Sequence, residues 1–279
     1  MINPFKITEP TCLSISGGRT SAYMLWRVLQ SNGGKLPPDA LACFANTGKE
    51  DEATLRFVRD CALFWNIKIH WVERRFDDVG FALVDFETAS RNGEPFEALI
   101  RARNYLPNPV ARICTSELKI RAQAKYLASI NHFDGLAYNA IEHLSWVGMR
   151  ADEQRRAAKI ADKSRIPLVA AGITKEHIGA FWRAHSFDLD LPNNNGVTMH
   201  GNCDLCFLKP AAQIASLISE KPARAVWWIK MESLALSSKP SGAMFRSDRP
   251  SYAQMAKFAA EQRDMFDPNE EAISCFCGD

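Results

Sequence analysis

The sequence lacks the features that would place it in a membrane or mark it for export. No apolar run approaches the roughly 18 residues that a membrane span needs, and the N-terminal stretch 1–6 has no signal-peptide core. The net charge is only +2, which by itself gives no argument for a nucleic-acid partner. We therefore expect a cytoplasmic protein that makes no membrane contact.

The commonest nucleotide-binding and zinc-binding patterns are also absent. The sequence has neither the Walker pattern G-x-x-x-x-G-K-[ST] nor the dinucleotide pattern G-x-G-x-x-G. A second C-x-x-C is missing, which excludes a four-cysteine zinc ribbon, and no internal repeat or low-complexity segment is visible. The 279 residues, 47% hydrophobic and 24% charged, are typical of one globular domain or one domain with an extension.

A strand, a glycine turn and a helical pattern stand near the start of the chain. Residues Cys12–Ile15 are mostly apolar and predict a short buried strand, Ser16-Gly17-Gly18 predicts a tight turn, and a helical pattern runs from Ala22. Glycines let a backbone approach a ligand closely, and free N–H groups at a helix start favour anions. With the hydroxyls of this turn and the charge of Arg19, the pattern predicts a phosphate site, although an ordinary left-handed turn would look similar.

The next elements extend this pattern into an α/β sheet. We predict a strand at 40–45, a helix at 52–64 and a third strand that alternates through Ile67, Ile69 and Trp71. The order β-α-β-α-β predicts a parallel sheet with right-handed crossovers. Because the carboxyl ends of its first two strands lie side by side, we expect residues 16–21 and 46–52 to face one ligand.

Further along the chain the pattern weakens and then turns helical. Residues 74–109 are expected to be irregular, as a lid or binding loop. A helix is expected to open near Cys114 with Thr115 or Ser116 as its N-cap, and a strand is expected at 145–149. Arginines 150, 155 and 156 follow that strand and suit either an anion or a solvated helix start. Helices are then predicted at 175–185, with Thr174 as its cap, and at 210–218, 222–236 and 251–265.

The eight cysteines fall into two groups. Three lie in apolar patterns and are interpreted as core residues, namely Cys12, Cys43 and Cys61. Five lie in polar or turn-like settings, namely Cys114, Cys203, Cys206, Cys275 and Cys277. The C-x-x-C spacing of Cys203 and Cys206 lets two thiolates reach one metal or form a redox pair. Together with Cys114 and one tail cysteine they would make a four-thiolate site for an iron–sulfur cluster or zinc, and unligated thiols are the alternative.

Several separated motifs together resemble the phosphoadenosine phosphosulfate (PAPS) reductase family of the PP-loop adenine nucleotide alpha-hydrolase superfamily. Ser16–Ser21 resembles the PP-loop, and Asn46-Thr47-Gly48 with Glu52-Ala53-Thr54 is similar to that family's (D/N)TG…(E)T element. Cys114-Thr115 with Leu118-Lys119 resembles its cysteine-plus-LK segment, Gly148–Glu153 its G-(I/M)-R-x-x-E element, and Gly201–Cys206 its C-x-x-C region. The resemblance covers about residues 12–210 in the same order.

The resemblance implies a Rossmann-like HUP-type parallel sheet flanked by helices at 1–210. The helical patterns of the last third predict a mainly helical extension with a cysteine-containing tail at 211–279. The resemblance also implies nucleotide-binding residues at Ser14, Ser16, Gly17, Gly18, Arg19, Thr20, Ser21, Asn46, Thr47, Gly48, Gly148 and Arg150. Arg19, Ser21 and Cys277 are implied to be catalytic. Cys114, Cys203, Cys206 and Cys277 would hold a [4Fe–4S] cluster or zinc, and Glu52 would orient Mg²⁺.

Three functions follow from this resemblance. The first is an ATP pyrophosphatase that adenylates an acceptor, because the Ser-Gly-Gly start of the loop is found in members that cleave ATP at the α phosphate. A nucleic-acid base is one candidate acceptor, and the reaction would be linked to sulfur transfer. The second is a PAPS or adenylyl-sulfate reductase that releases sulfite, although the chain lacks the Glu-Cys-Gly-Leu-His tail of that group. The third is a non-catalytic nucleotide-binding module. A homo-oligomer is compatible with all three.

Overall fold

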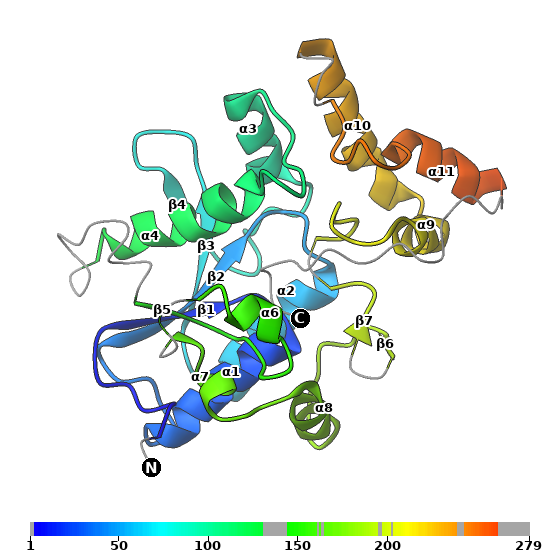
Figure 1. Cartoon of the computed structure of the whole chain (residues 1–279). Helices are drawn as coiled ribbons and strands as arrows, with labels where there is room; N and C mark the ends of the chain where they lie inside the picture. Colours follow the sequence, from blue (N-terminus) through cyan, green and yellow to red (C-terminus); the bar gives the residue numbers. More distant parts are fainter. Residues whose placement is uncertain are drawn as a thin grey trace.

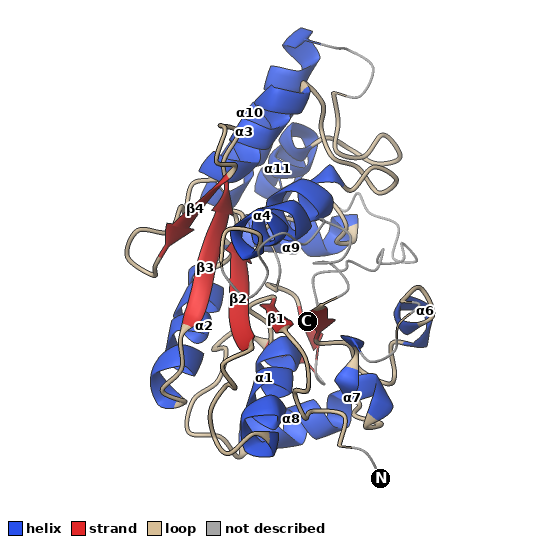
Figure 2. Cartoon of the chain, turned by 90° about the vertical axis from the view of Figure 1, so that its left-hand side faces the viewer, coloured by secondary structure: helices blue, strands red, loops and turns tan. Residues whose placement is uncertain are grey.

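The computed structural model describes residues 3–130, 144–160, 162, 165–194, 197–201, 203–238 and 243–261. Within these residues a five-stranded sheet has the order β4-β3-β2-β1-β5, and β6 and β7 form a separate hairpin. The strands are β1 Thr11–Ile15, β2 Ala40–Asn46, β3 Ile69–Arg74, β4 Phe81–Val84, β5 Ser145–Val147, β6 Asn193–Asn194 and β7 Val197–Thr198. Strands β3, β2, β1 and β5 are parallel, and β4 runs antiparallel at the edge beside β3 (Figure 2).

The helices of the described residues surround this sheet and extend beyond it (Figure 1). They are α1 Arg19–Ser31, α2 Glu52–Phe64, α3 Glu94–Arg103, the π-helix η1 Cys114–Arg121, α4 Ala122–Leu127, α6 Gln154–Ala157, α7 Pro167–Ala170, α8 Lys175–Arg183, α9 Ala211–Glu220, α10 Ala223–Ser238 and α11 Tyr252–Glu261.

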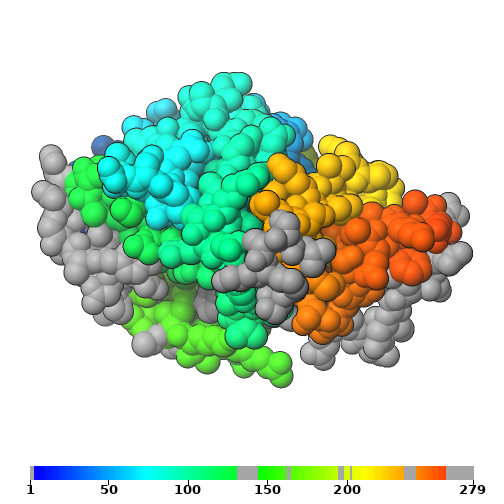
Figure 3. Space-filling model, turned by 90° about the horizontal axis from the view of Figure 1, so that it is seen from above, coloured from blue at the N-terminus to red at the C-terminus, as the bar shows by residue number. Residues whose placement is uncertain are grey.

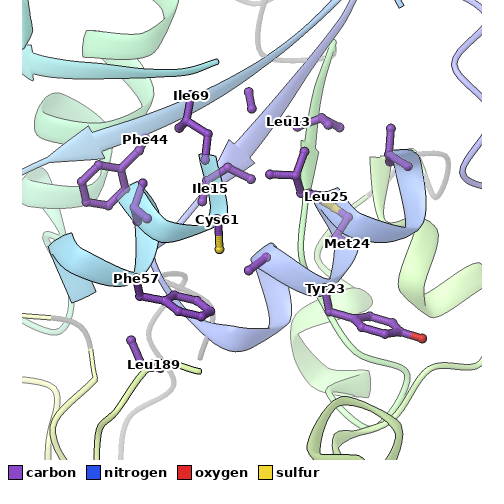
Figure 4. Close-up of a cluster of buried hydrophobic side chains, with 14 of the residues drawn as sticks. Leu13, Ile15, Tyr23, Met24, Leu25, Phe44, Phe57, Cys61, Ile69 and Leu189 are labelled. Carbon is purple, nitrogen blue, oxygen red and sulfur yellow. The ribbon is translucent and has the colours of Figure 1, made fainter. Parts of the chain in front are cut away.

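Alternation along the strands creates two buried faces, because successive side chains of a strand point to opposite sides. Leu13 and Ile15 of β1 face α1 and α2, and they belong to the same apolar cluster as Met24 and Phe57 (Figure 4). Cys12 points the other way and packs with Cys43, Val72 and α4 in a second cluster. The result is a three-layer α/β/α arrangement in which the sheet is covered on both sides.

The fold class predicted from the sequence is confirmed as a Rossmann-like α/β fold with a mainly helical region toward the C-terminus. The helix predicted at 52–64 has these bounds, and the ends of the helices predicted at 175–185, 210–218 and 222–236 are found within two residues of the predicted positions. Cys12, Cys43 and Cys61 are buried as expected. No helix in the described part of the chain is long and apolar enough to cross a membrane.

Four local predictions were wrong. Residues 74–109 are not irregular throughout, because β4 and α3 lie there. Helix α1 begins at Arg19 rather than at Ala22, since the tight turn leads directly into it. The next helix begins at Cys114 after Ile113, so neither Thr115 nor Ser116 is its N-cap. The strand predicted at 145–149 ends at Val147.

A second apolar core lies above the sheet in the view of Figure 1, among α3, α9, α10 and α11. It includes Phe96 of α3, Phe207 and Trp228, so it combines residues from both sides of the boundary predicted at 210/211. The space-filling view shows α3 lying against α10 on one face of the molecule (Figure 3). The helical region therefore shares its core with part of the predicted nucleotide-binding region, and the predicted division into domains stays a prediction.

Candidate functional site

The strand order places a crevice beside β1. The chain builds β2 and β3 on one side of β1 and then returns to add β5 on the other side, and open α/β sheets bind ligands outside the carboxyl ends of strands at such a reversal. A pocket is found at this position. It is lined by the turn after β1 (Ser16–Thr20), Thr54 of α2, Arg150 after β5, and Lys175 and Gly179 of α8.

The turn after β1 has a backbone that glycine favours. Gly17 has φ +82°, and a Cβ at this position would lie 2.4 Å from Cγ2 of Thr54. The buried Ser21 closes the turn, because its Oγ accepts from the Ser16 backbone N–H at 3.1 Å and donates to the Gly18 carbonyl at 3.1 Å. The structure thus places Ser21 as a group that holds the loop, and its predicted catalytic role stays a prediction.

Helix α1 opens directly onto the pocket. Its N-cap is Gly18, which has no side chain to cap the helix, and its first turn contains no acidic residue. The first amides of an α-helix have no partner within the helix, and they carry the positive end of the helix dipole. This helix start therefore favours an anion in the pocket.

Arg19 lies in the pocket and is held by a carboxylate. Its Nε donates to Oδ1 of Asp188 at 2.7 Å and its Nη2 to Oδ2 at 2.9 Å, a bidentate pair. The backbone carbonyl of Arg19 accepts from Nε1 of the buried Trp182 at 3.1 Å. Because Asp188 uses the Nε side of the guanidinium, and no described residue accepts a hydrogen bond from Nη1, the Nη1 edge can still meet an anion.

Two further cations line the pocket. Arg150 donates from Nη1 to Thr20 Oγ1 at 3.3 Å and from Nε to Asp152 at 3.2 Å. The residue before Met149 is Gly148, where a Cβ would lie 2.6 Å from Cα of Ser21, so the end of β5 packs directly on α1. Lys175 is exposed, and its ammonium forms no ion pair with any residue in the described ranges.

The polar residues that follow β2 bond to other residues of the chain and do not line the pocket. The fully buried Asn46 donates to Glu73 at 2.7 Å and to the Ser90 carbonyl at 2.9 Å. The hydroxyl of Thr47 donates to the Glu50 carboxylate at 2.8 Å. These groups and Gly48, whose carbonyl accepts from Gly93 N–H at 2.8 Å, are absent from the described pocket lining.

Ser14 also points away from the pocket. Its hydroxyl donates to Gln123 Oε1 of α4 at 3.2 Å, on the opposite face of the sheet from α1. Of the residues predicted to bind nucleotide, the structure therefore brings together Ser16–Thr20 and Arg150, with Ser21 and Gly148 directly behind them.

Glu52 does not fit the role predicted for it with Mg²⁺. Its carboxylate pairs with Arg91, at 2.8 Å from Nε and 3.3 Å from Nη2, and this hydrogen bond raises the pKa of Arg91. The carboxylate is absent from the described lining of the pocket. We therefore assign no magnesium-dependent step to Glu52.

Three of the cysteines predicted to bind a metal lie at the second apolar core. Cys203 and Cys206 end a hydrogen-bonded turn, with Cys206 N–H donating to the Cys203 carbonyl at 3.2 Å, and Cys114 packs against the same apolar cluster. Cys203 Sγ also lies 3.7 Å from Thr47 Oγ1. Two thiols at this spacing can share a metal. The described residues contain no group of three or more ligands, and Cys275 and Cys277 lie outside the described residues, so the four-thiolate site stays a prediction.

A buried ion pair fixes the cysteine turn to the loop after β2. Lys49 Nζ lies 2.9 Å from Oδ2 of Asp204, and both side chains are almost entirely buried. Asp204 Oδ1 accepts from Trp228 Nε1 at 2.8 Å, and Asp204 N–H donates to the Lys49 carbonyl at 2.8 Å. The loop after β2 is therefore a packing partner of the cysteine turn.

Sequence reasoning did not assign Thr54 or Lys175 to the pocket lining, and it did not find Asp188 as the partner of Arg19. Lys175 had a usable signal, because Thr174 is a recognisable N-cap and a helix start favours anions. Asp188 had none, since it meets Arg19 only through the tertiary fold, 169 positions along the chain.

The fold and this pocket define an α/β protein with a cation-lined pocket at the switch point of its sheet. Among known proteins, the chain is 32% identical over 212 residues to the uncharacterized nin region protein ORF290 of Escherichia phage lambda, and the matched region covers 72% of this chain and 67% of the phage protein. The chain belongs to the family of that phage protein. No protein-family model matches it.

Proposed function

We propose that this chain is a PP-loop enzyme that binds an adenine nucleotide by its phosphates and cleaves ATP at the α phosphate to adenylate an acceptor. The observation that carries the proposal is the pocket itself. A glycine turn, the uncapped start of α1 and three cationic side chains converge at the switch point of the sheet, and this combination favours a phosphate ligand.

The pocket groups suit the charge changes of this reaction. A nucleophilic atom of the acceptor forms a bond to the α phosphorus while the bond from that phosphorus to the bridging oxygen breaks, and pyrophosphate leaves with the electron pair. Charge then builds up on the leaving pyrophosphate. Fixed amide donors at the start of α1, with Arg19 and Lys175, would stabilise that charge without needing to reorganise.

Each side chain has a separate task in this proposal. Arg150, tied to Thr20 and Asp152, would orient the phosphate nearest the end of β5. Arg19, held on one side by Asp188, would present its Nη1 edge to the leaving group. Ser16 and Ser21 would keep the loop closed around these contacts. The iron–sulfur or zinc site predicted from the cysteines is given no step, because its full ligand set lies partly outside the described residues.

The proposal is tested by binding and turnover of ATP. Equilibrium dialysis with labelled ATP should show saturable binding to the full chain, and Arg19→Gln should weaken that binding at least about tenfold, or about 1.4 kcal/mol. Pyrophosphate release should then be measured with nucleic-acid acceptors present.

A matched control is Arg56→Gln, which removes the same charge from an exposed position on α2 outside the pocket and should bind ATP as the wild type does. Absence of ATP binding by the wild type would overturn the proposal. Release of sulfite from PAPS with a thiol reductant, without pyrophosphate release from ATP, would overturn it in favour of the reductase.

A further inference from the structure

A second pocket adjoins the first along helix α8. It shares Arg19, Lys175, Gly179 and Asn193 with the pocket at the turn after β1. It then continues past Trp182 and Arg183 toward Asp188. Arg19 therefore lines both pockets, and a ligand in the first pocket can extend into the second.

Helix α8 presents its cations toward this second pocket in a regular way. Lys175, Gly179 and Arg183 are four residues apart, so they lie on one face of the helix. A Cβ at Gly179 would lie 3.2 Å from Nη1 of Arg183, so the Arg183 side chain folds back along this face over the glycine. The helix face thus carries two cations, and the Arg183 guanidinium lies over Gly179 between them.

These two cations differ from Arg19 in their pairing. In the described residues neither the ammonium of Lys175 nor the guanidinium of Arg183 forms an ion pair, whereas Arg19 is paired with Asp188. The other carboxylate in the lining, Glu176, accepts from Thr174 Oγ1 at 2.6 Å, and this bond, with the nearby charge of Lys175 as a smaller cause, lowers the pKa of Glu176. Counting Arg19, Lys175 and Arg183 against Glu176 and Asp188 leaves one positive charge in the lining.

We infer that the groove along α8 is a second anion subsite, which receives the terminal phosphate of a polyphosphate whose inner phosphates are held by the turn after β1. The inference rests on the proposed function and deepens it, because it names Arg183 as the residue that distinguishes nucleoside triphosphates from nucleoside monophosphates. Arg19 stands between the two subsites and contacts both parts of the chain of phosphates, and Arg183 contacts only the distal part.

The test compares AMP, ADP and ATP binding to the full chain by isothermal titration calorimetry. Wild-type affinity should rise from AMP to ATP. Arg183→Gln should weaken ATP binding about five- to tenfold and ADP binding less, and it should leave AMP binding within twofold. Arg183→Lys should restore most of the loss because it keeps the charge. Arg56→Gln, the matched control on α2, should change none of the three affinities.

The outcomes separate this inference from the proposed function. If Arg183→Gln leaves ATP binding within twofold, or weakens AMP and ATP equally, the second subsite is refuted while nucleotide binding stands. If the wild type binds none of the three nucleotides, the proposed function fails and the subsite fails with it. Circular dichroism spectra and melting temperatures of the variants confirm that each comparison is made between folded proteins.

Discussion

The loops that follow β1 and β2 lie at the same edge of one sheet, yet they differ in whether their polar groups are already used. After β2, Asn46 bonds to Glu73 and Ser90, and Thr47 bonds to Glu50. After β1, the loop is closed by Ser21, but the start of α1 has only a glycine at its N-cap.

The β2 loop therefore has a structural role, whereas the β1 loop can bind a ligand. Buried polar groups are costly unless hydrogen-bonded, and those of the β2 loop have found partners within the chain. The β1 loop lies beside Lys175, whose ammonium forms no ion pair with any described residue. Similar sequence motifs at neighbouring strand ends therefore do not imply a shared ligand.

The largest expected effect is on stability, from the β2 loop. Lys49→Met leaves the Asp204 carboxylate buried without its cation, and removing one partner of a buried pair costs about 3–5 kcal/mol. We expect a loss of about 3 kcal/mol in the free energy of unfolding, measured in urea, with ATP affinity within twofold of the wild type at low temperature.

Arg101→Met is the control for this change, because it breaks an exposed pair with Glu97 and should cost less than about 0.5 kcal/mol. A folded Lys49→Met variant that had lost ATP binding would show that the β2 loop takes part in the site.

The next largest effect is expected from a change in the β1 loop, which should lower both the stability and the affinity for ATP. Gly17→Ala places a side chain at φ +82° and within 2.4 Å of Thr54, and a left-handed conformation alone costs an alanine about 1–2 kcal/mol. We expect a loss of about 2 kcal/mol in the free energy of unfolding, and ATP binding weaker by at least about tenfold, or about 1.4 kcal/mol.

Gly33→Ala is the matched control, since Gly33 has φ +77° and open space around it. It should cost about 1 kcal/mol of stability and leave ATP binding unchanged. Equal ATP binding by wild type and Gly17→Ala would argue against the β1 loop as the phosphate site.

The sequence was informative where the signal is local. The apolar strand, the glycine turn and the periodic helices at 52–64 and 175–183 follow from spacing alone, and so does the order that makes the sheet parallel. Helix α3 was not predicted from the sequence, although Phe96, Leu99 and Ile100 have helical spacing. The residues before this helix have the composition of a loop, and the whole stretch was therefore interpreted as irregular. Strand β4 gave no clear alternation, since it is a short, half-exposed edge strand.

The site was harder to predict than the fold because it depends on which polar groups find partners. Asn46 and Arg19 both looked like ligand-binding residues in the sequence. Only the tertiary fold shows that the Asn46 side chain donates to Glu73. It also shows that Asp188 binds one side of the Arg19 guanidinium, so that Nη1 can still bind a ligand. Such pairings join residues that are far apart in the chain, and no local pattern reports them.

A smaller effect on binding is expected at Asp188. Asp188→Asn removes a carboxylate that competes with phosphate for Arg19, and a unit charge at about 4 Å in water is worth about 1 kcal/mol. We expect ATP binding about fivefold tighter, with a steeper decline as salt is added. Calorimetry at two salt concentrations checks this, and weaker binding would show instead that Asp188 acts chiefly by orienting Arg19.

The smallest effect is a pH dependence of stability that belongs to neither loop. His70 on β3 lies against Tyr126 of α4, with its Nδ1 2.5 Å from the Tyr126 hydroxyl. Burial, and secondarily Lys68, lowers the pKa of His70 to about 4, whereas an unfolded histidine titrates near 6.5. Between these values the unfolded chain binds more protons, so stability is complete above about pH 6.5 and falls as the pH drops toward 4.

Because His70 is partly exposed, we expect a loss of only about 1 kcal/mol across this pH range. Urea unfolding of wild type and His70→Gln at pH 7 and pH 4.5 measures it, and the variant should lose less stability than the wild type between the two values. An equal loss in both proteins would assign the pH dependence to other groups.

The difference between the two loops is tested most directly by nuclear magnetic resonance of the ¹⁵N-labelled full chain titrated with ATP. We predict large, saturable shifts of the backbone amide signals of residues 17–20 and small shifts for residues 47–49. Shifts concentrated at residues 47–49, or no saturable shift at either loop, would contradict the account.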